Sequence, residues 1–288
     1  MSTLKTINII HPTGSTNNMV SDAGGNVTVG NNLTVTGNVT IGGANVVAAN
    51  ASAIGQIPFS TNGTSFVATQ KITQATAVTT TTTSFTGATS GISTTLTASS
   101  VTGTIQIGQV IAGTGIAAGT VITGGSGTTW TISPASTGTV SGTITVVGVD
   151  FLSIPSWVKR ITLILNGVST SGTAYIRFRL GTASGIESSG YNASSTYVGT
   201  SVADGAISSA GFDGYGDAGA SGARYGTYTF TYMGSNIWSL TGSHSFATAF
   251  IFSITGNKAL AGTLDRLRVT TANGTDTFDA GSINILYE

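Results

Sequence analysis

Apolar and polar residues alternate near the start of the chain in three consecutive six-residue units. The units are 25–30, 31–36 and 37–42, and each carries Asn, an apolar residue, Thr and an apolar residue at the same positions. A period of two is that of a β-strand, and a unit this short has an apolar edge that another unit or another chain must cover. We therefore predict a β shaft between identical chains. Its inward-facing residues are Val27, Val29, Leu33, Val35, Val39 and Ile41.

Short apolar runs separated by glycine turns continue through the middle of the chain. Residues 109–111, 130–132 and 143–147 are examples. No window of ten or more residues anywhere places apolar residues at the spacing of a helix. The pattern predicts an all-β chain with a small β module in this middle part.

The C-terminal part alternates more regularly. In 174–180, Ile176 and Phe178 lie on one face and Arg177 and Arg179 on the other, which is typical of a half-buried antiparallel strand. At least seven strands with turns between them predict an antiparallel β-sandwich, jelly-roll-like in topology. Further strands are predicted at 158–165, 227–232, 247–254, 264–269 and 283–287.

Charge divides the chain near residues 148–153. Before this point the only charged side chains are Lys5, Asp22 and Lys71, whereas all eight tyrosines lie after it. A composition of this kind suits an independent core only in the later part. The predicted division is an N-terminal arm with hexad shaft (1–43), a connector (44–91), a middle β module (92–148) and a C-terminal β-sandwich domain (149–288).

The overall composition excludes several classes of partner. Only 7% of the 288 residues are charged, against roughly a quarter in an ordinary soluble domain, and the formal net charge is zero. Without a basic stripe, nucleic acid binding is not expected. No apolar run approaches the ~18 residues of a membrane span, so no membrane insertion is expected. The absence of Cys and of a P-loop or dinucleotide motif predicts no cofactor.

A stretch rich in Gly, Ser, Tyr and Asp between residues 185 and 224 is the candidate binding surface. We expect long polar loops here, in which Tyr offers a large contact area at low entropic cost while Gly and Ser let the loops adapt. Ligand binding, contact with another subunit or a capsid, and disorder are the alternatives. The candidate contact residues are Tyr191, Tyr197, Asp213, Tyr215, Asp217, Arg224 and Tyr225.

Two Arg-x-Arg pairs place both of their side chains on one face of a strand. Recognition of an anionic glycan, or of a carboxylate across a subunit interface, is one interpretation. The simpler interpretation is pairing with Asp265, Asp276 or Asp279 on the same sheet. The pairs are Arg177 with Arg179 and Arg266 with Arg268.

Groups suited to catalysis or metal binding are sparse. Asp213 and Asp217 on a flexible loop suit Ca²⁺, but the twelve-residue EF-hand pattern is missing and acidic turns are ordinary without an ion. A glycan hydrolase needs two carboxylates held several Å apart. His11 and His244 are the only histidines, and His244 lacks the flanking pattern of a nucleophile elbow. We predict neither a metal site nor an enzyme.

Three parts of the chain resemble bacteriophage fibre proteins. Residues 1–5 and 12–14, with the hexads, are similar to the N-terminal region of many phage fibres. Residues 108–110 and 113–116 resemble a β module of phage tail and other virion proteins. The most specific resemblance is to the C-terminal domain of phage fibre-like proteins. It is carried by 154–161 (IPSWVKRI), 165–172 (LNGVSTSG) and 276–288 (DTFDAGSINILYE).

The resemblance implies a virion structural protein, commonly trimeric and made in the cytoplasm of a bacterial host. We expect a noncatalytic homotrimeric fibre, attached to the virion by its N-terminal arm, whose C-terminal domain adheres to the host surface. Its partners would be copies of itself, capsid or tail proteins, and a host-surface glycan or receptor. The alternative is a capsid cement or head-decoration protein. A bacterial surface adhesin is a third, more distant interpretation.

Overall fold

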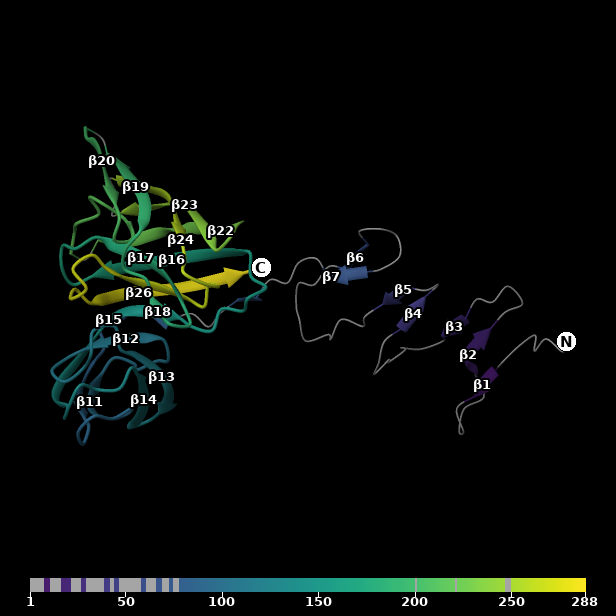
Figure 1. Cartoon of the computed structure of the whole chain (residues 1–288), viewed down its shortest axis with the longest axis horizontal. Helices are drawn as coiled ribbons and strands as arrows, with labels where there is room; N and C mark the ends of the chain where they lie inside the picture. Colours follow the sequence, from purple (N-terminus) through teal and green to yellow (C-terminus); the bar gives the residue numbers. More distant parts are fainter. Residues whose placement is uncertain are drawn as a thin grey trace. The chain divides into compact units, whose positions relative to one another are not determined.

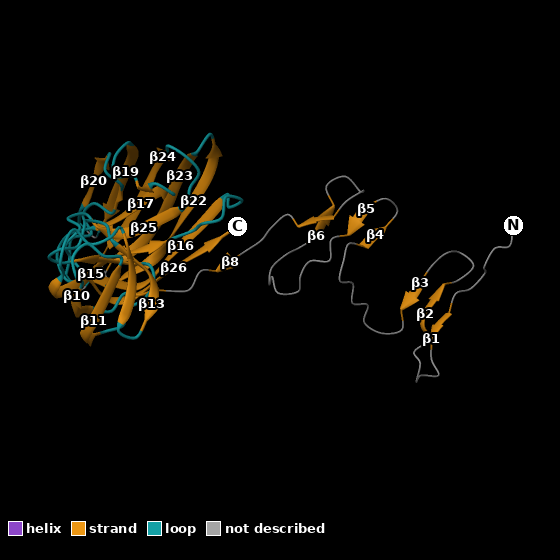
Figure 2. Ribbon diagram, turned by 60° about the horizontal axis from the view of Figure 1, so that its bottom comes forward, coloured by secondary structure: helices purple, strands orange, loops and turns teal. Residues whose placement is uncertain are grey.

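The computed structural model describes residues 78–288 except 200, 221 and 247–249, together with short strand segments before residue 78. Contacts divide the chain into two units, Met1–Lys71 and Ile72–Glu288. The described residues form strands, turns and loops without a helix (Figure 2), so the prediction of an all-β chain is confirmed for them. Correspondingly, this part of the chain has no helix of the length and hydropathy needed to cross a bilayer.

The strands described in the first unit form two small sheets, with the strand orders β1-β2-β3 and β4-β5-β7-β6. Their bounds are β1 (Asn8–Ile10), β2 (Asn17–Ser21), β3 (Val27–Val29), β4 (Val39–Ile41), β5 (Ala44–Val46), β6 (Pro58–Ser60) and β7 (Phe66–Ala68).

The predicted hexads fall in this unit. β3 and β4 lie in the first and third hexads, where they pair with β2 and β5. Leu33 and Val35 lie outside the described residues, as do the side chains on β3 and β4. The shaft between chains therefore stays a prediction.

In the second unit, strands β10 to β15 form a closed barrel of six antiparallel strands (Figure 1). Neighbours follow the order β10-β11-β14-β13-β12-β15, and pairing of β10 with β15 closes the ring. The strands are β10 (Ser84–Ala88), β11 (Thr95–Thr102), β12 (Gln109–Ala112), β13 (Val121–Ser126), β14 (Thr129–Ser133) and β15 (Ser141–Phe151).

Along the barrel strands, buried side chains alternate with exposed ones, and the buried ones fill the barrel. Along β14 the apolar Trp130 and Ile132 point inward and the flanking threonines outward. Space inside is tight, because a Cβ atom at Gly87 would lie 2.6 Å from Cγ1 of Ile144. The barrel thus has its own core. Its largest fully buried members are Phe85, Leu96, Ile111, Ile122, Ile132 and Ile144.

Strand β15 leaves the barrel and enters a second sheet. Its residues 145–149 pair with β12, and its last four residues pair with β25. β25 in turn pairs with β17, which carries β18 and β21 on its other side. The added strands are β17 (Ile176–Thr182), β18 (Gly185–Ile186), β21 (Phe212–Asp213) and β25 (Arg266–Thr271).

A nine-stranded antiparallel sheet covers this extension. Its order is β20-β19-β24-β23-β22-β16-β26-β8, with β9 also on β26. The strands are β8 (Thr73–Gln74), β9 (Val78–Thr79), β16 (Arg160–Thr170), β19 (Tyr191–Val198), β20 (Ala203–Ser208), β22 (Arg224–Gly234), β23 (Ile237–Phe246), β24 (Phe250–Ala259) and β26 (Phe278–Tyr287).

One hydrophobic core joins the two sheets. Phe178 on β17 lies with its ring centroid 4.7 Å from that of Tyr228 and 6.4 Å from that of Phe230, both on β22. The same cluster includes Leu267 of β25 and Ile285 of β26. The sheets therefore pack face to face, while the predicted jelly-roll-like topology stays a prediction.

The predicted domain limits lie within strands or beside them. β10 belongs to the barrel although residues 44–91 were expected to be a connector, and β15 crosses the boundary expected at 148–149. Barrel and sandwich keep separate cores but share one strand. The division into four parts stays a prediction, with the observed separation at 71–72.

Replacing Phe178 tests the packing between the sheets. Phe178→Ala should lower the free energy of unfolding by about 3–5 kcal/mol, because the side chain is fully buried and its loss leaves a cavity. Urea denaturation measures the change. Tyr225→Ala, at an exposed position on the neighbouring sheet, is the aromatic control and should cost less than about 1 kcal/mol. Equal effects would contradict the assigned core.

Candidate functional site

The stretch expected to be a long polar loop contains four strands, β18 to β21, joined by shorter loops. β19 and β20 form a hairpin that pairs from Ala193–Ser208 to Val198–Ala203, and β21 adds to β17. The prediction was wrong because small polar residues concealed a strand pattern. Tyr191, Ala193 and Ser195 alternate inward, while the residues between them are exposed.

Tyr191 lies in the core and not on a binding surface. Its hydroxyl accepts a hydrogen bond from the Leu180 amide at 2.8 Å and donates one to the Glu187 carbonyl at 2.9 Å. Burial raises the pKa of Tyr191. The ring also packs edge-on against Phe212 at a centroid distance of 5.1 Å. Its role in the fold is to tie β17 to β19.

Asp213 is likewise satisfied inside the fold. Arg177 Nε and Nη2 donate to its two carboxylate oxygens at 2.5 and 2.8 Å, and Ser208 Oγ donates at 2.7 Å. These hydrogen bonds raise the pKa of Arg177. Because Arg177 is on β17, Ser208 on β20 and Asp213 on β21, these hydrogen bonds hold the three strands together.

The remaining predicted tyrosines occupy different places. Tyr197 packs against Phe252 at 5.3 Å, and the half-buried Tyr215 contacts Tyr175 at 6.0 Å between centroids. Tyr225 stands out from β22 with 54% of its surface exposed. The structure therefore does not gather the candidate contact residues into one surface.

Asp217 and Arg224 form a fully buried ion pair. Arg224 Nε donates to Asp217 Oδ2 at 2.6 Å and Nη2 donates to the Asp217 carbonyl at 2.7 Å, with both side chains 0% exposed. The other oxygen, Oδ1, accepts the Ile176 amide at 3.1 Å. Asp217 thus binds β17 of one sheet and β22 of the other, and fixes the loop 214–223 between them.

Two further polar side chains complete this network. The Tyr228 hydroxyl and His244 Nδ1 are 2.5 Å apart, and the imidazole stacks on Phe252 at 5.0 Å. His244 Nε2 lies 3.2 Å from Asp217 Oδ2, but its alignment leaves this nitrogen without a hydrogen-bond partner in the described part of the chain. Sequence reasoning missed Tyr228, because nothing in a β-strand pattern marks one inward tyrosine as polar and paired.

This network resembles a proton relay but is closed to solvent. Tyr228, His244, Asp217 and Arg224 are each at most 2% exposed, so no substrate reaches them in this conformation. Buried charges require partners, and the geometry supplies them. The Ca²⁺ alternative is not supported, because Asp213 and Asp217 are each occupied by a different arginine.

Of the Arg-x-Arg pairs, only Arg266 forms the pairing that the simpler interpretation named, with Asp265 at 2.7 Å. Arg177 and Arg268 pair with Asp213 and Asp150 instead, and Arg179 donates through Nε to the Ala210 carbonyl at 2.8 Å. Asp276 and Asp279 pair with no arginine among the described residues. They accept hydrogen bonds from Ala174 N and Ser169 Oγ instead.

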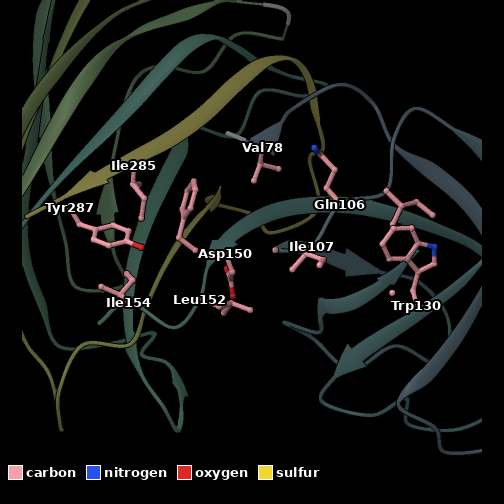
Figure 3. Close-up of a pocket in the computed structure, with 13 residues that line it drawn as sticks. Val78, Gln106, Ile107, Trp130, Asp150, Leu152, Ile154, Ile285 and Tyr287 are labelled. Atoms are coloured by element: carbon pink, nitrogen blue, oxygen red, sulfur yellow. The ribbon is translucent and has the colours of Figure 1, made fainter. Parts of the chain in front are cut away.

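An apolar cavity lies between the barrel and the sandwich (Figure 3). Its volume is about 590 Å³. Side chains from both cores point toward it, so it can accommodate an apolar group of a ligand or partner. It is lined by Val78, Ile105, Gln106, Ile107, Gly108, Gly125, Trp130, Asp150, Phe151, Leu152, Ile154, Ile285 and Tyr287.

Asp150 supplies the carboxylate in the cavity wall. Arg268 donates to both of its oxygens, at 2.6 and 2.7 Å, and also to the Gly119 carbonyl at 3.0 Å. Burial raises the pKa of Asp150, and Arg268 opposes this shift. The sequence did not reveal the cavity, because its lining comes from segments more than 200 residues apart.

Comparison with protein-family models, with curated proteins and with solved structures found no match. The functional argument therefore depends on the residues and geometry of this chain.

The buried ion pair generates a stability prediction. Arg224→Met should lower the free energy of unfolding by about 3–5 kcal/mol, because the Asp217 carboxylate would stay buried without its cation. Adding Asp217→Asn should recover part of the loss. Arg160→Met is the matched control. The Arg160 side chain is 53% exposed beside Glu288, and this change should cost less than about 1 kcal/mol. A small effect of Arg224→Met would contradict the network.

Tyr228 generates a prediction for alkaline pH. Burial raises its pKa well above the ordinary value of 10.0, and Asp217 adds to the shift. The stability contributed by the neutral phenol is complete below pH 10 and is lost as pH rises toward the folded-state pKa. Tyr228→Phe should therefore reduce the fall in unfolding free energy above pH 10 by up to about 1.4 kcal/mol per pH unit. Urea denaturation at a series of pH values above 10 measures this slope of the unfolding free energy. Tyr225→Phe, at an exposed position, should leave the slope unchanged.

Proposed function

We propose that the protein is a noncatalytic structural protein of a bacteriophage virion, a homotrimeric fibre that displays residues 72–288 for attachment to a host surface. The observation that carries the proposal is the organisation into two units: a first unit with hexads and few charges, followed by a large all-β unit. The resemblance of 154–161, 165–172 and 276–288 to fibre-like proteins supports it.

The finer architecture belongs to the same proposal. Residues 1–43 are the virion-attachment arm and the interchain shaft, in which the hexads of three chains cover one another's apolar edges. The jelly-roll-like C-terminal sandwich faces outward. The internal pairing of Asp213, Asp217 and Arg224 supports a rigid display domain, because these charges stabilise the fold and do not reach a ligand.

Capsid cement or head decoration is the second candidate. It is favoured by the low charge of residues 1–71, whose charged side chains are Lys5, Asp22 and Lys71, because a segment with few charges suits burial against adjoining capsid subunits. Antibody labelling of 72–288 on intact particles distinguishes the two, since signal over the head supports decoration or a head fibre and signal at the tail supports host attachment.

Light scattering on the purified chain tests the oligomer. The full chain should have three times the chain mass of 28.7 kDa. A truncated chain that begins at Ile72 should have lower order, since it lacks the hexads. This cut follows the observed separation of the units and leaves β15 intact. A monomeric full chain would contradict the shaft, and a trimeric truncated chain would move the trimer contact to the second unit.

A further inference from the structure

The outer face of the nine-stranded sheet carries a regular set of polar side chains. On four neighbouring strands, every outward position in three successive rows is Ser, Thr or Asn. We call these twelve residues the hydroxyl face. They are Thr227, Thr229 and Thr231 on β22, Ser239, Thr241 and Ser243 on β23, Ser253, Thr255 and Asn257 on β24, and Asn192, Ser194 and Thr196 on β19.

The strand register aligns these side chains across the sheet. In the central row, Thr229 is opposite Thr241, Thr241 is opposite Thr255, and Thr255 is opposite Ser194. Neighbouring strands are about 4.8 Å apart, and successive outward residues about 6.8 Å apart along a strand. The result is a two-dimensional lattice of polar groups with a nearly constant spacing.

The hydroxyls of this lattice are available to a ligand. In the row of Thr229 and the adjacent row of Thr227, none of the eight side chains hydrogen bonds to another described residue. A hollow of about 290 Å³ lies over the part of these two rows that β19, β23 and β24 supply, next to Thr227 and Thr229 on β22. It is lined by Ser194, Thr196, Thr241, Gly242, Ser243, Ser253, Ile254 and Thr255.

The chemistry of the face selects one class of ligand. Each Ser or Thr hydroxyl donates and accepts, as a sugar hydroxyl does, and so does each Asn amide. No charged residue occurs among the twelve, and the cation at their border, Arg160 opposite Thr231, is already paired with Glu288, so an anionic glycan would find few of the cations that recognise it. Protein interfaces are enriched in aromatic residues, Met and Arg and depleted in Ser, unlike this face. A neutral polyhydroxylated ligand fits best.

An apolar border adjoins the lattice. The next row contains Val198, Ile251, Ser245 and Tyr225, each opposite the next across the strands. Val198 and Ile251 are 58% and 61% exposed, and Tyr225, 54% exposed, ends the row on β22 with its ring against Gly167 of β16. Such side chains suit the apolar C–H face of a sugar ring, with the phenol hydroxyl free to hydrogen bond. Tyr225 is the one predicted contact residue that lies on this face.

We propose that the hydroxyl face binds a neutral polysaccharide. The chain of sugars lies in the hollow, its hydroxyls hydrogen bond to the lattice, and one ring rests on Tyr225. This inference rests on the proposed attachment function, for which it supplies the ligand class and the surface.

Calorimetric titration of the full chain with dextran, mannan and amylose tests the proposal. At least one of these neutral probes should bind, and the anionic polymer alginate should bind more weakly. The variant Thr229→Val, Thr241→Val, Thr255→Val keeps the β-branched shape and removes three hydroxyls. It should bind at least about tenfold more weakly, because each hydrogen bond contributes about 0.5–1.5 kcal/mol.

The matched control is Thr95→Val, Thr129→Val, Thr131→Val. These threonines are exposed on β11 and β14 of the barrel. This control should bind like the wild type. Unchanged binding by the hydroxyl-face variant would overturn the proposal, as would a change in its solution mass, which would make the face an interface between copies.

The outcomes separate this proposal from the proposed function. A trimeric chain that binds none of the three neutral probes overturns the polysaccharide site and leaves the fibre standing. A chain that is monomeric in solution, yet loses polysaccharide binding with the Val substitutions, keeps the site and overturns the trimer.

Discussion

Strand β15 is the element on which residues 72–288 depend. One half of it closes the barrel with β10 and β12, and its last residues pair with β25 in the sandwich. A rigid strand shared by two cores leaves no hinge between them. The Asp150–Arg268 pair reinforces this junction, because it joins β15 to β25 and reaches the barrel at the Gly119 carbonyl. The apolar cavity lies beside the same junction.

Charge is used sparingly, and five charged side chains of the described residues are buried: Asp150, Asp213, Asp217, Arg224 and Lys258. Asp217 contacts a strand of each sheet, and Asp213 is held between β17 and β20. An unpaired buried carboxylate would be costly, so each of these pairs specifies where a loop must lie. On the outer face of the large sheet, the three rows of the hydroxyl face hold neutral polar groups alone, with Arg160 at their border paired with Glu288.

Periodicity was sufficient to predict the fold class and several strands. The alternation of Ile176, Phe178 and Leu180 correctly placed β17, and the aromatic row at 227–232 correctly placed β22. The hairpin β19–β20 escaped prediction, because Ser and Gly carry little hydrophobic signal. The barrel closure and the cavity also escaped, since both depend on pairings between distant segments. The site was harder still. Asp217 and Arg224 were predicted to contact a ligand or partner, whereas the packing of the two sheets buries them against each other, which no local pattern in the sequence indicates.

The strand edges of the barrel and of the nine-stranded sheet determine whether a strand of another copy can add to them. The six-stranded barrel presents no free strand edge, since β10 and β15 complete the ring. The nine-stranded sheet ends at β20, a short strand that carries the exposed Asp204 beside Gly205. A charge and a glycine at such an edge oppose the addition of a further strand. Neighbouring copies of the chain can therefore lie close together at this edge without extending the sheet of one copy into the next.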